Sequence, residues 1–258
     1  MKRFRFTVLI HSFARIMLLA LLTPAAFAQG ASTANVLGRL STAFSGGQIV
    51  QSVQLSGSAT WYAGSTEDSG TVTLTASSNG ASQMQLALAA KGQRTESKTG
   101  TGSNASCQWA GNDGVAHNVD LGNCWKPTLW FLPPFSLQPS QLPSNLGVVD
   151  LGIGTVGTSS PTYRHLQGQL NFSSLPNSLS TYLAQQGSAD LGLDPVTLLP
   201  MVLAYSIHPD NGAPVAIAIE VHYSEYRAVN GVQIPFLIQR YVNGALQLEI
   251  QVSSAQIN

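Results

Sequence analysis

Hydrophobic and polar residues alternate through the C-terminal part of the chain. One face of an extended strand at 245–252 would be entirely aliphatic, formed by Leu246, Leu248, Ile250 and Val252. Glutamine and glutamate occupy the other face, which is the period of a half-buried strand. Two similar runs precede it, and the pairs Asn230-Gly231 and Asn243-Gly244 separate the three. Asn-Gly tolerates the positive φ of a tight hairpin turn. Residues 215–258 are therefore predicted to form three antiparallel strands, whose apolar face another part of the chain must cover.

Strand patterns of this kind recur through most of the chain. The first run, at 49–62, contains Gly57, which predicts a bulge or bend. Further strands are expected at 71–76, 83–88, 93–99, 106–110, 115–119, 146–156 and 163–172, and on both sides of Asp194-Pro195. A turn is predicted at Glu67–Gly70. For the strand after Asp194-Pro195, a helix over 196–205 is the alternative, although Pro200 would lie in the middle of that helix. About ten or eleven antiparallel strands are expected in all.

Helical periodicity is clearest at residues 32–45, directly before the first strand. Ser32 or Thr33 can cap this helix, and Gly46 can end it. Its apolar stripe would consist of Val36, Leu37, Leu40 and Phe44. A second, shorter helix is predicted at 177–186. Because a one-sided sheet of this size must curl or enclose a helix, we predict a mainly β fold with few helices. Specifically, an open antiparallel half-barrel would wrap around the N-terminal helix and leave room for a cavity.

The first 28 residues have the features of a secretory signal peptide. Lys2, Arg3, Arg5 and Arg15 make the start basic, and an apolar run follows at 16–22. Ala26-Phe27-Ala28 supplies a cleavage site, and no cysteine for lipid attachment follows it. An N-terminal membrane anchor is the alternative. The sequence thus predicts a periplasmic or secreted protein with a single β domain at 29–258.

Charge and composition exclude one class of partner. The 258 residues include 12 basic and 12 acidic side chains, and charged residues make up only 9%. Four of the basic ones lie in the predicted signal peptide, so the remainder is mildly acidic and has no basic run. Nucleic-acid binding requires clustered lysine and arginine, so it is not expected.

Cys107 and Cys124 are the only cysteines. In an exported protein such a pair is most simply a disulfide bond. A redox pair is the alternative, but the Cys-x-x-Cys spacing is missing. Between Cys124 and Phe135 the chain contains prolines at 127, 133 and 134, which exclude a long helix or a central strand. An ordered apolar loop is expected there.

Residues for catalysis or metal binding are not evident. The histidines at 117, 165, 208 and 222 lie on different predicted elements, without the spacing of a zinc site. No Gly-x-Ser-x-Gly motif is present. We therefore expect no catalytic residue, no metal and no cofactor, and a hydrolase is only an alternative.

Four features follow one another along the chain: the helix after the signal peptide, the long strand meander, Leu193-Asp-Pro-x-Thr-x-Leu-Pro200 and Tyr226-Arg-x-Val-x-Gly-Val-x-Ile-Pro235. Together they resemble the LolA/LolB/RseB-type lipoprotein-carrier-like superfamily. The match in order covers most of residues 29–258. The resemblance implies an open β-barrel around helices with an apolar cavity for acyl chains. No functional residue can be transferred from it, because no arginine here corresponds clearly to the carrier's lid-locking arginine.

The functional hypothesis is accordingly a non-catalytic, monomeric carrier for a hydrophobic small molecule or lipid moiety. Candidate ligand-binding residues are Trp61, Met84, Leu86, Trp125, Trp130 and Phe131. The alternative for the loop aromatics is a satellite core held by the disulfide. The alternative function is an envelope protein-interaction or sensor module whose partner is a protein and whose cavity is filled by its own side chains.

Overall fold

One antiparallel sheet contains all the strands that the structure describes. The computed structural model describes residues 25–100, 105–119, 121–124, 130–137, 146–158, 161–170, 187–209 and 215–258. Six strands come from the N-terminal half: β1 (Ser52–Ala63), β2 (Thr66–Ser77), β3 (Ser82–Leu88), β4 (Gly92–Thr99), β5 (Ser106–Ala110) and β6 (Ala116–Asn118). Seven come from the C-terminal half: β7 (Leu146–Gly154), β8 (Tyr163–Leu170), β9 (Ser188–Leu193), β10 (Pro200–Ile207), β11 (Ile217–Val229), β12 (Val232–Val242) and β13 (Ala245–Ile257). The structure describes 13 strands, which is more than the predicted ten or eleven.

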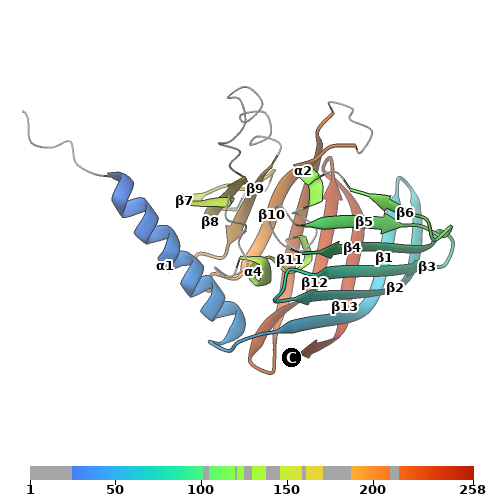
Figure 1. Ribbon diagram of the computed structural model, residues 1–258, viewed down its shortest axis with the longest axis horizontal. Coiled ribbons are helices and arrows are strands. Elements are labelled where there is room, and N and C mark those ends of the chain that lie inside the picture. The colour runs from blue at the N-terminus through green and yellow to red at the C-terminus, as the bar shows by residue number, and fades with distance from the viewer. Residues whose placement is uncertain are drawn as a thin grey trace, which may run out of the picture.

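The strand order shows how two meanders share one sheet (Figure 1). The order is β6-β5-β4-β3-β2-β1-β13-β12-β11-β10-β9-β8-β7, so every neighbouring pair is consecutive in sequence except β1 and β13. Val53 of β1 pairs with Ile257, at the far end of the chain. The sheet does not close, because β6 and β7 form its two edges. The predicted open antiparallel fold is confirmed.

Local turn and bulge signals mostly act as predicted. Asn230 and Asn243 have φ of 49° and 48°, and the glycine after each is also at positive φ. The register of β1 against β13 shifts between Ser56 and Gly57, where a bulge or bend was expected. A Cβ on Gly57 would collide with the Gln251 carbonyl oxygen, so only glycine fits there.

The predicted turn at Glu67–Gly70 is wrong, because β2 runs through these residues. The chain reverses at Gly64 and Ser65 instead. The polar side chains of this part of β2 have structural partners. Asp68 is buried and accepts hydrogen bonds from the backbone N–H groups of Ala90 (3.0 Å) and Lys91 (2.7 Å) in the next turn. A polar stretch therefore remains extended because it anchors the turn between β3 and β4.

Helix α1 (Ala25–Ser45) packs on the same side of the sheet as the core. It begins before the predicted start at residue 32, since alanines favour continuation toward the N-terminus. Its predicted stripe is buried: Val36, Leu37, Leu40 and Phe44 join one core cluster with the inward residues of the sheet. The helix contacts β7, β12 and α4 (Pro133–Ser136). The predicted N-terminal helix is thus confirmed, and it forms one part of a layer that covers the inward face of the sheet.

The second part of this layer is the connection between β6 and β7, residues 119–145. Because these strands are opposite edges of the sheet, the connection must pass from one edge to the other, and we call it the crossing connection. Its described parts are residues 119, 121–124 and 130–137, which include α2 (Leu121–Cys124) and α4. Both helices lie in front of the sheet in Figure 1. Trp130, Phe131, Leu132 and Phe135 are buried in the main core cluster. The predicted apolar loop therefore covers the sheet.

Some predictions fall outside the described residues. These are the helix at 177–186, the position of Trp125 and almost all of the signal peptide at 1–28, of which only residues 25–28 are described. Among the helices of the described chain, none combines the length and the apolar character needed to cross a bilayer.

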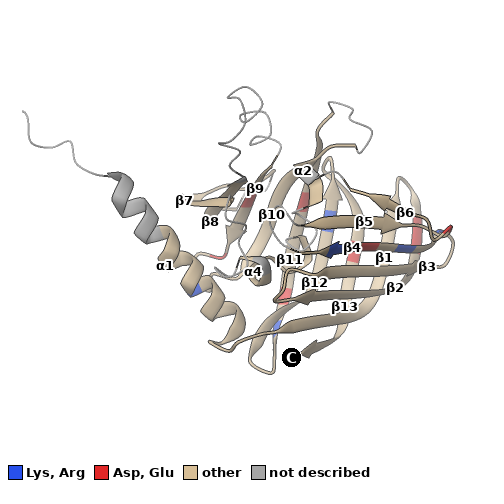
Figure 2. Ribbon diagram, viewed as in Figure 1, with Lys and Arg blue, Asp and Glu red and all other residues tan. Residues whose placement is uncertain are grey.

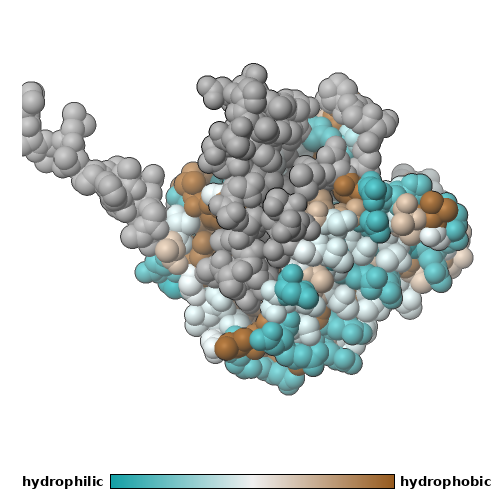
Figure 3. Space-filling view, in the orientation of Figure 1, coloured by the Kyte–Doolittle hydropathy of each residue, from teal (hydrophilic) through white to brown (hydrophobic). Residues whose placement is uncertain are grey.

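Charged side chains are sparse, but β4 carries a row of them (Figure 2). Arg94, Glu96 and Lys98 alternate along this strand. Hydrophobic residues are exposed at the other end of the sheet, on edge strand β7 (Figure 3), where Val149, Leu151 and Ile153 are 42%, 50% and 59% exposed.

Candidate functional site

Three attachments hold the crossing connection over the sheet. Cys124 of α2 forms a disulfide with Cys107 of β5, with Cα atoms 5.3 Å apart. Asn123 donates a hydrogen bond to the His208 carbonyl (2.7 Å) and accepts one from the His208 backbone N–H (3.1 Å). The Tyr223 hydroxyl donates to the Trp130 carbonyl (2.7 Å) from the buried face of β11. The connection is therefore fixed to both halves of the sheet.

Removing the disulfide is expected to weaken this attachment. The variant with Cys107→Ser and Cys124→Ser should lose about 3 kcal/mol of unfolding free energy, because the unfolded chain regains the entropy of an open loop. Urea denaturation followed by tryptophan fluorescence measures the loss. The control is wild-type protein in reductant, which should match the variant. An unchanged denaturation midpoint in both would contradict a stabilising disulfide.

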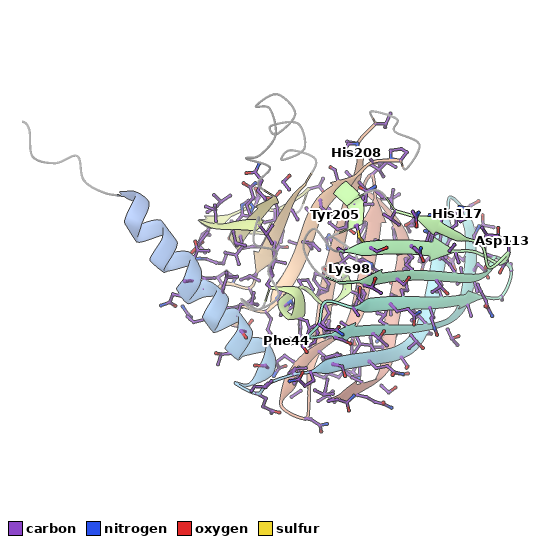
Figure 4. All side chains as sticks on the ribbon, in the orientation of Figure 1. Phe44, Lys98, Asp113, His117, Tyr205 and His208 are labelled. Carbon is purple, nitrogen blue, oxygen red and sulfur yellow. A yellow bond between two sulfur atoms is a disulfide. The ribbon has the colours of Figure 1, made fainter. Side chains whose placement is uncertain are left out.

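A cavity of about 430 Å³ lies between the crossing connection and the sheet. Three tryptophans line it: Trp61 of β1, Trp109 of β5 and Trp130 of the connection. Aliphatic side chains on β10, β11 and β12 complete its apolar surface: Ile207, Ile217, Ile219 and Val242. Figure 4 shows Tyr205 and His208, which also line the cavity, at the end of β10 beside α2. The cavity wall thus combines apolar side chains with several polar and charged groups.

Two of the predicted ligand-binding residues meet in this cavity. Trp61 and Trp130 both line it, although they are 69 positions apart in the sequence. Met84, Leu86 and Phe131 lie instead in the packed core, each no more than 2% exposed. They do not line the cavity. Trp109, which the sequence places near the cysteine, stacks on His117 with ring centroids 4.2 Å apart.

The charged groups of the cavity come from β4 and β12. Arg94 and Glu96 form an ion pair of 2.7 Å on β4, and the Arg94 guanidinium also lies 4.8 Å from the Trp109 ring centre. Arg240 of β12 lies 5.0 Å from the Trp130 ring centre and 5.9 Å from that of Trp61. Such contacts are favourable cation–π geometry. A guanidinium therefore faces the same space as two of the tryptophans.

Burial shifts the pKa values of two groups on the sheet. It raises the pKa of Tyr205, with a smaller upward effect of the Glu96 carboxylate and a downward effect of Arg240. The Tyr205 hydroxyl therefore remains protonated at neutral pH and keeps its hydrogen for donation. Burial lowers the pKa of Lys98, on the same strand as Glu96, to about 8.

Sequence reasoning missed Arg240 and Gln247 as cavity residues. Arg240 has the same strand parity as the buried Ile234, Phe236 and Ile238, so parity alone places it on the inward face. Gln247 was predicted to face away from the aliphatic side of the last strand. It lines the cavity because the register of β12 against β13 shifts between Arg240 and Tyr241, and no sequence pattern marks that bulge.

The four described histidines have separate surroundings. His165 contacts Asp190 (2.8 Å), and His222 contacts Glu220 (3.3 Å). Within the described ranges, no group of three or more histidine, cysteine, aspartate or glutamate side chains is arranged to hold a metal ion.

Comparison by sequence finds neither a matching family model nor a matching curated protein. Comparison by structure does find proteins of similar fold. A DUF1329 family protein from Desulfovibrio piger superposes with a TM-score of 0.56 at 8% identity, over 88% of this chain and 92% of that one. A LolA superfamily protein from Nitrosomonas europaea gives a TM-score of 0.52 at 10% identity, over 88% and 93%. The fold is LolA-like.

A third neighbour agrees with this assignment. It is a putative outer membrane lipoprotein-sorting protein domain from Vibrio parahaemolyticus, with a TM-score of 0.55, 7% identity and coverage of 88% and 93%. Identities this low establish the LolA-like fold alone. They confirm the resemblance that the order of sequence features indicates.

Proposed function

We propose that this chain is a non-catalytic, exported carrier that binds a hydrophobic ligand, an acyl chain or a lipid, in the cavity beneath the crossing connection. The observation that carries the proposal is a cavity of about 430 Å³ with three tryptophans in its wall. Ligand pockets typically have roughly 300–1,000 Å³ and an apolar lining with a few polar groups. Each buried methylene would contribute about 0.8 kcal/mol to binding. The LolA-like fold supports a carrier of this kind.

The proposed location is the periplasm or the exterior, and the protein is proposed to act as a monomer. Support for export comes from the predicted signal peptide at 1–28 and from the disulfide, which persists in oxidising compartments. The proposed partner is a hydrophobic small molecule or lipid moiety.

Filling the cavity should abolish binding of an apolar probe. Val242→Trp places a large ring at the cavity wall, where Val242 is only partly buried. Wild-type protein is expected to bind the neutral fluorophore N-phenyl-1-naphthylamine with enhanced emission, and Val242→Trp should bind it at least tenfold more weakly. Val149→Trp, on exposed edge strand β7, is the matched control and should bind like wild type.

A second measurement concerns the natural ligand. Native mass spectrometry of protein purified from its own envelope is expected to show a bound lipid. If no lipid is retained and the wild type also fails to bind the fluorophore, the carrier function is refuted. Equal binding by wild type and Val242→Trp would place the probe outside this cavity.

A protein-interaction module remains the second candidate function, with an envelope protein as the partner. The observation that favours it is the exposed aliphatic row Val149, Leu151 and Ile153 on an edge strand. Edge strands can accept an added strand from a partner, and apolar side chains then supply specificity. This function would take precedence if the cavity binds no apolar molecule at all.

A further inference from the structure

Arg240 occupies a position that strand parity would assign to a hydrophobic residue. It follows Val232, Ile234, Phe236 and Ile238 on the inward face of β12. Its neighbours across the sheet are Val221 and Leu248, which are fully buried. Two tryptophan rings flank the guanidinium. A permanently charged group on such a face costs desolvation energy, which folding alone does not explain.

Among the described residues that line this cavity, the charges do not balance. Arg94 is paired with Glu96 at 2.7 Å, so these two neutralise each other. Within the residues that the structure describes, Arg240 forms no ion pair with any carboxylate. Arg240 is half-buried, and charges that are withdrawn from water in proteins are normally paired. One positive charge in the cavity wall is thus left without a counter-charge from the described chain.

In the described part of the chain, two side chains that line this cavity have a polar atom without a hydrogen-bond partner. Across the described ranges, two buried side-chain polar atoms have no hydrogen-bond partner: Arg240 Nε and His208 Nδ1. Both residues line the cavity. An unsatisfied buried polar atom is unfavourable by about 1–3 kcal/mol, and such atoms are rare in native proteins. The described chain thus leaves hydrogen-bonding capacity unused on two side chains of one cavity wall.

We propose that the cavity selects amphiphiles with an anionic group, carboxylate or phosphate, which binds the Arg240 guanidinium while the apolar part contacts Trp61 and Trp130. This inference rests on the proposed carrier function and adds the chemistry of the ligand's polar end. A guanidinium presents N–H donors in a planar arrangement that matches two oxygens of a carboxylate or phosphate. The low-polarity walls strengthen that interaction, because they exclude competing water.

The test compares three ligands that share one apolar chain: dodecanoate, dodecyl phosphate and dodecanol, each below the concentration at which it forms micelles. Displacement of N-phenyl-1-naphthylamine from wild-type protein gives the affinities. At least one anionic ligand is expected to bind ten times more tightly than dodecanol. The tighter of the two anions identifies the head group. Acetate and inorganic phosphate, which lack the chain, should displace no probe.

Arg240→Gln is expected to remove the preference and to bind dodecanol within twofold of wild type. Arg227→Gln, an exposed arginine on β11, is the control and should keep the preference. If Arg240→Gln does not fold, Arg240→Lys retains the positive charge and should keep a smaller preference for the anions. Equal binding of all three ligands by wild type, or a preference that survives Arg240→Gln, refutes this inference and leaves the carrier function standing. Failure of wild type to bind even dodecanol and the fluorophore refutes both.

Discussion

Replacing Phe44 with alanine is expected to lower the free energy of unfolding by about 3–5 kcal/mol, the cost typical of a fully buried phenylalanine. Phe44 is 1% exposed, near the C-terminal end of α1, and belongs to the core cluster shared with the sheet (Figure 4). Its removal leaves a void between the helix and the sheet, which the rigid strands cannot close. Urea denaturation measured by circular dichroism gives the loss, provided that the slope with denaturant is unchanged.

The matched control for Phe44 is Ile49→Ala. Ile49 lies between α1 and β1 and is 85% exposed, so losing its side chain should change stability by no more than about 0.5 kcal/mol. A loss below about 1 kcal/mol for Phe44→Ala would mean that α1 is not packed into the concave side of the sheet. The carrier proposal would then lose one of the two elements that cover the sheet.

The sequence was sufficient to predict elements whose cause is local. The two Asn-Gly turns require positive φ, which few other residue pairs supply, and both were found where expected. The helical stripe from Val36 to Phe44 was likewise visible, because its spacing matches one helix face. The strands could be predicted in the same way, because hydrophobic and polar residues alternate along each of them. These signals depend on residues a few positions apart, so a single sequence displays them.

Other features depend on contacts between distant segments. The pairing of β1 with β13 joins the two meanders in the middle of the sheet, and nothing in either strand identifies the other. That pairing makes β6 and β7 opposite edges and so forces the crossing connection over the sheet. The N-terminal helix was the leading candidate to cover the apolar face of the sheet, and the connection covers it as well. The strand through Asp68 was missed for a related reason, since its partners lie 22 and 23 residues further on.

The candidate site was only partly predictable. Aromatic character selected Trp61 and Trp130, which do line the cavity, but it could not separate them from Phe131 in the core. Arg240 could have been found by applying the parity rule to a charged residue as well as to aliphatic ones. Gln247 could not, because its direction depends on a bulge that only the pairing of β12 with β13 defines.

Breaking the ion pair between Asp150 and Arg164 should have the second large effect on stability. The Asp150 side chain is 3% exposed, and its Oδ2 accepts a hydrogen bond from Arg164 Nε at 3.1 Å. The other carboxylate oxygen accepts the Gly152 backbone N–H (2.9 Å), and the Asp150 backbone N–H donates to Thr33 of α1 (3.1 Å). Arg164→Met leaves this buried carboxylate without its cation, which is expected to cost about 3 kcal/mol. Urea denaturation at neutral pH measures the loss.

Two comparisons separate the charge effect from lost packing. Adding Asp150→Asn to Arg164→Met removes the unpaired charge and keeps an oxygen for the Gly152 N–H, so the double variant should recover most of the lost stability. Arg227→Met breaks a similar pair with Glu225, in which the two side chains are 56% and 46% exposed, and it should cost no more than about 1 kcal/mol. If the double variant is as unstable as Arg164→Met alone, packing of the arginine stem rather than charge pairing stabilises this junction. Because Asp150 connects β7, β8 and α1, the result also shows whether electrostatics or apolar burial holds the helix against the free edge of the sheet.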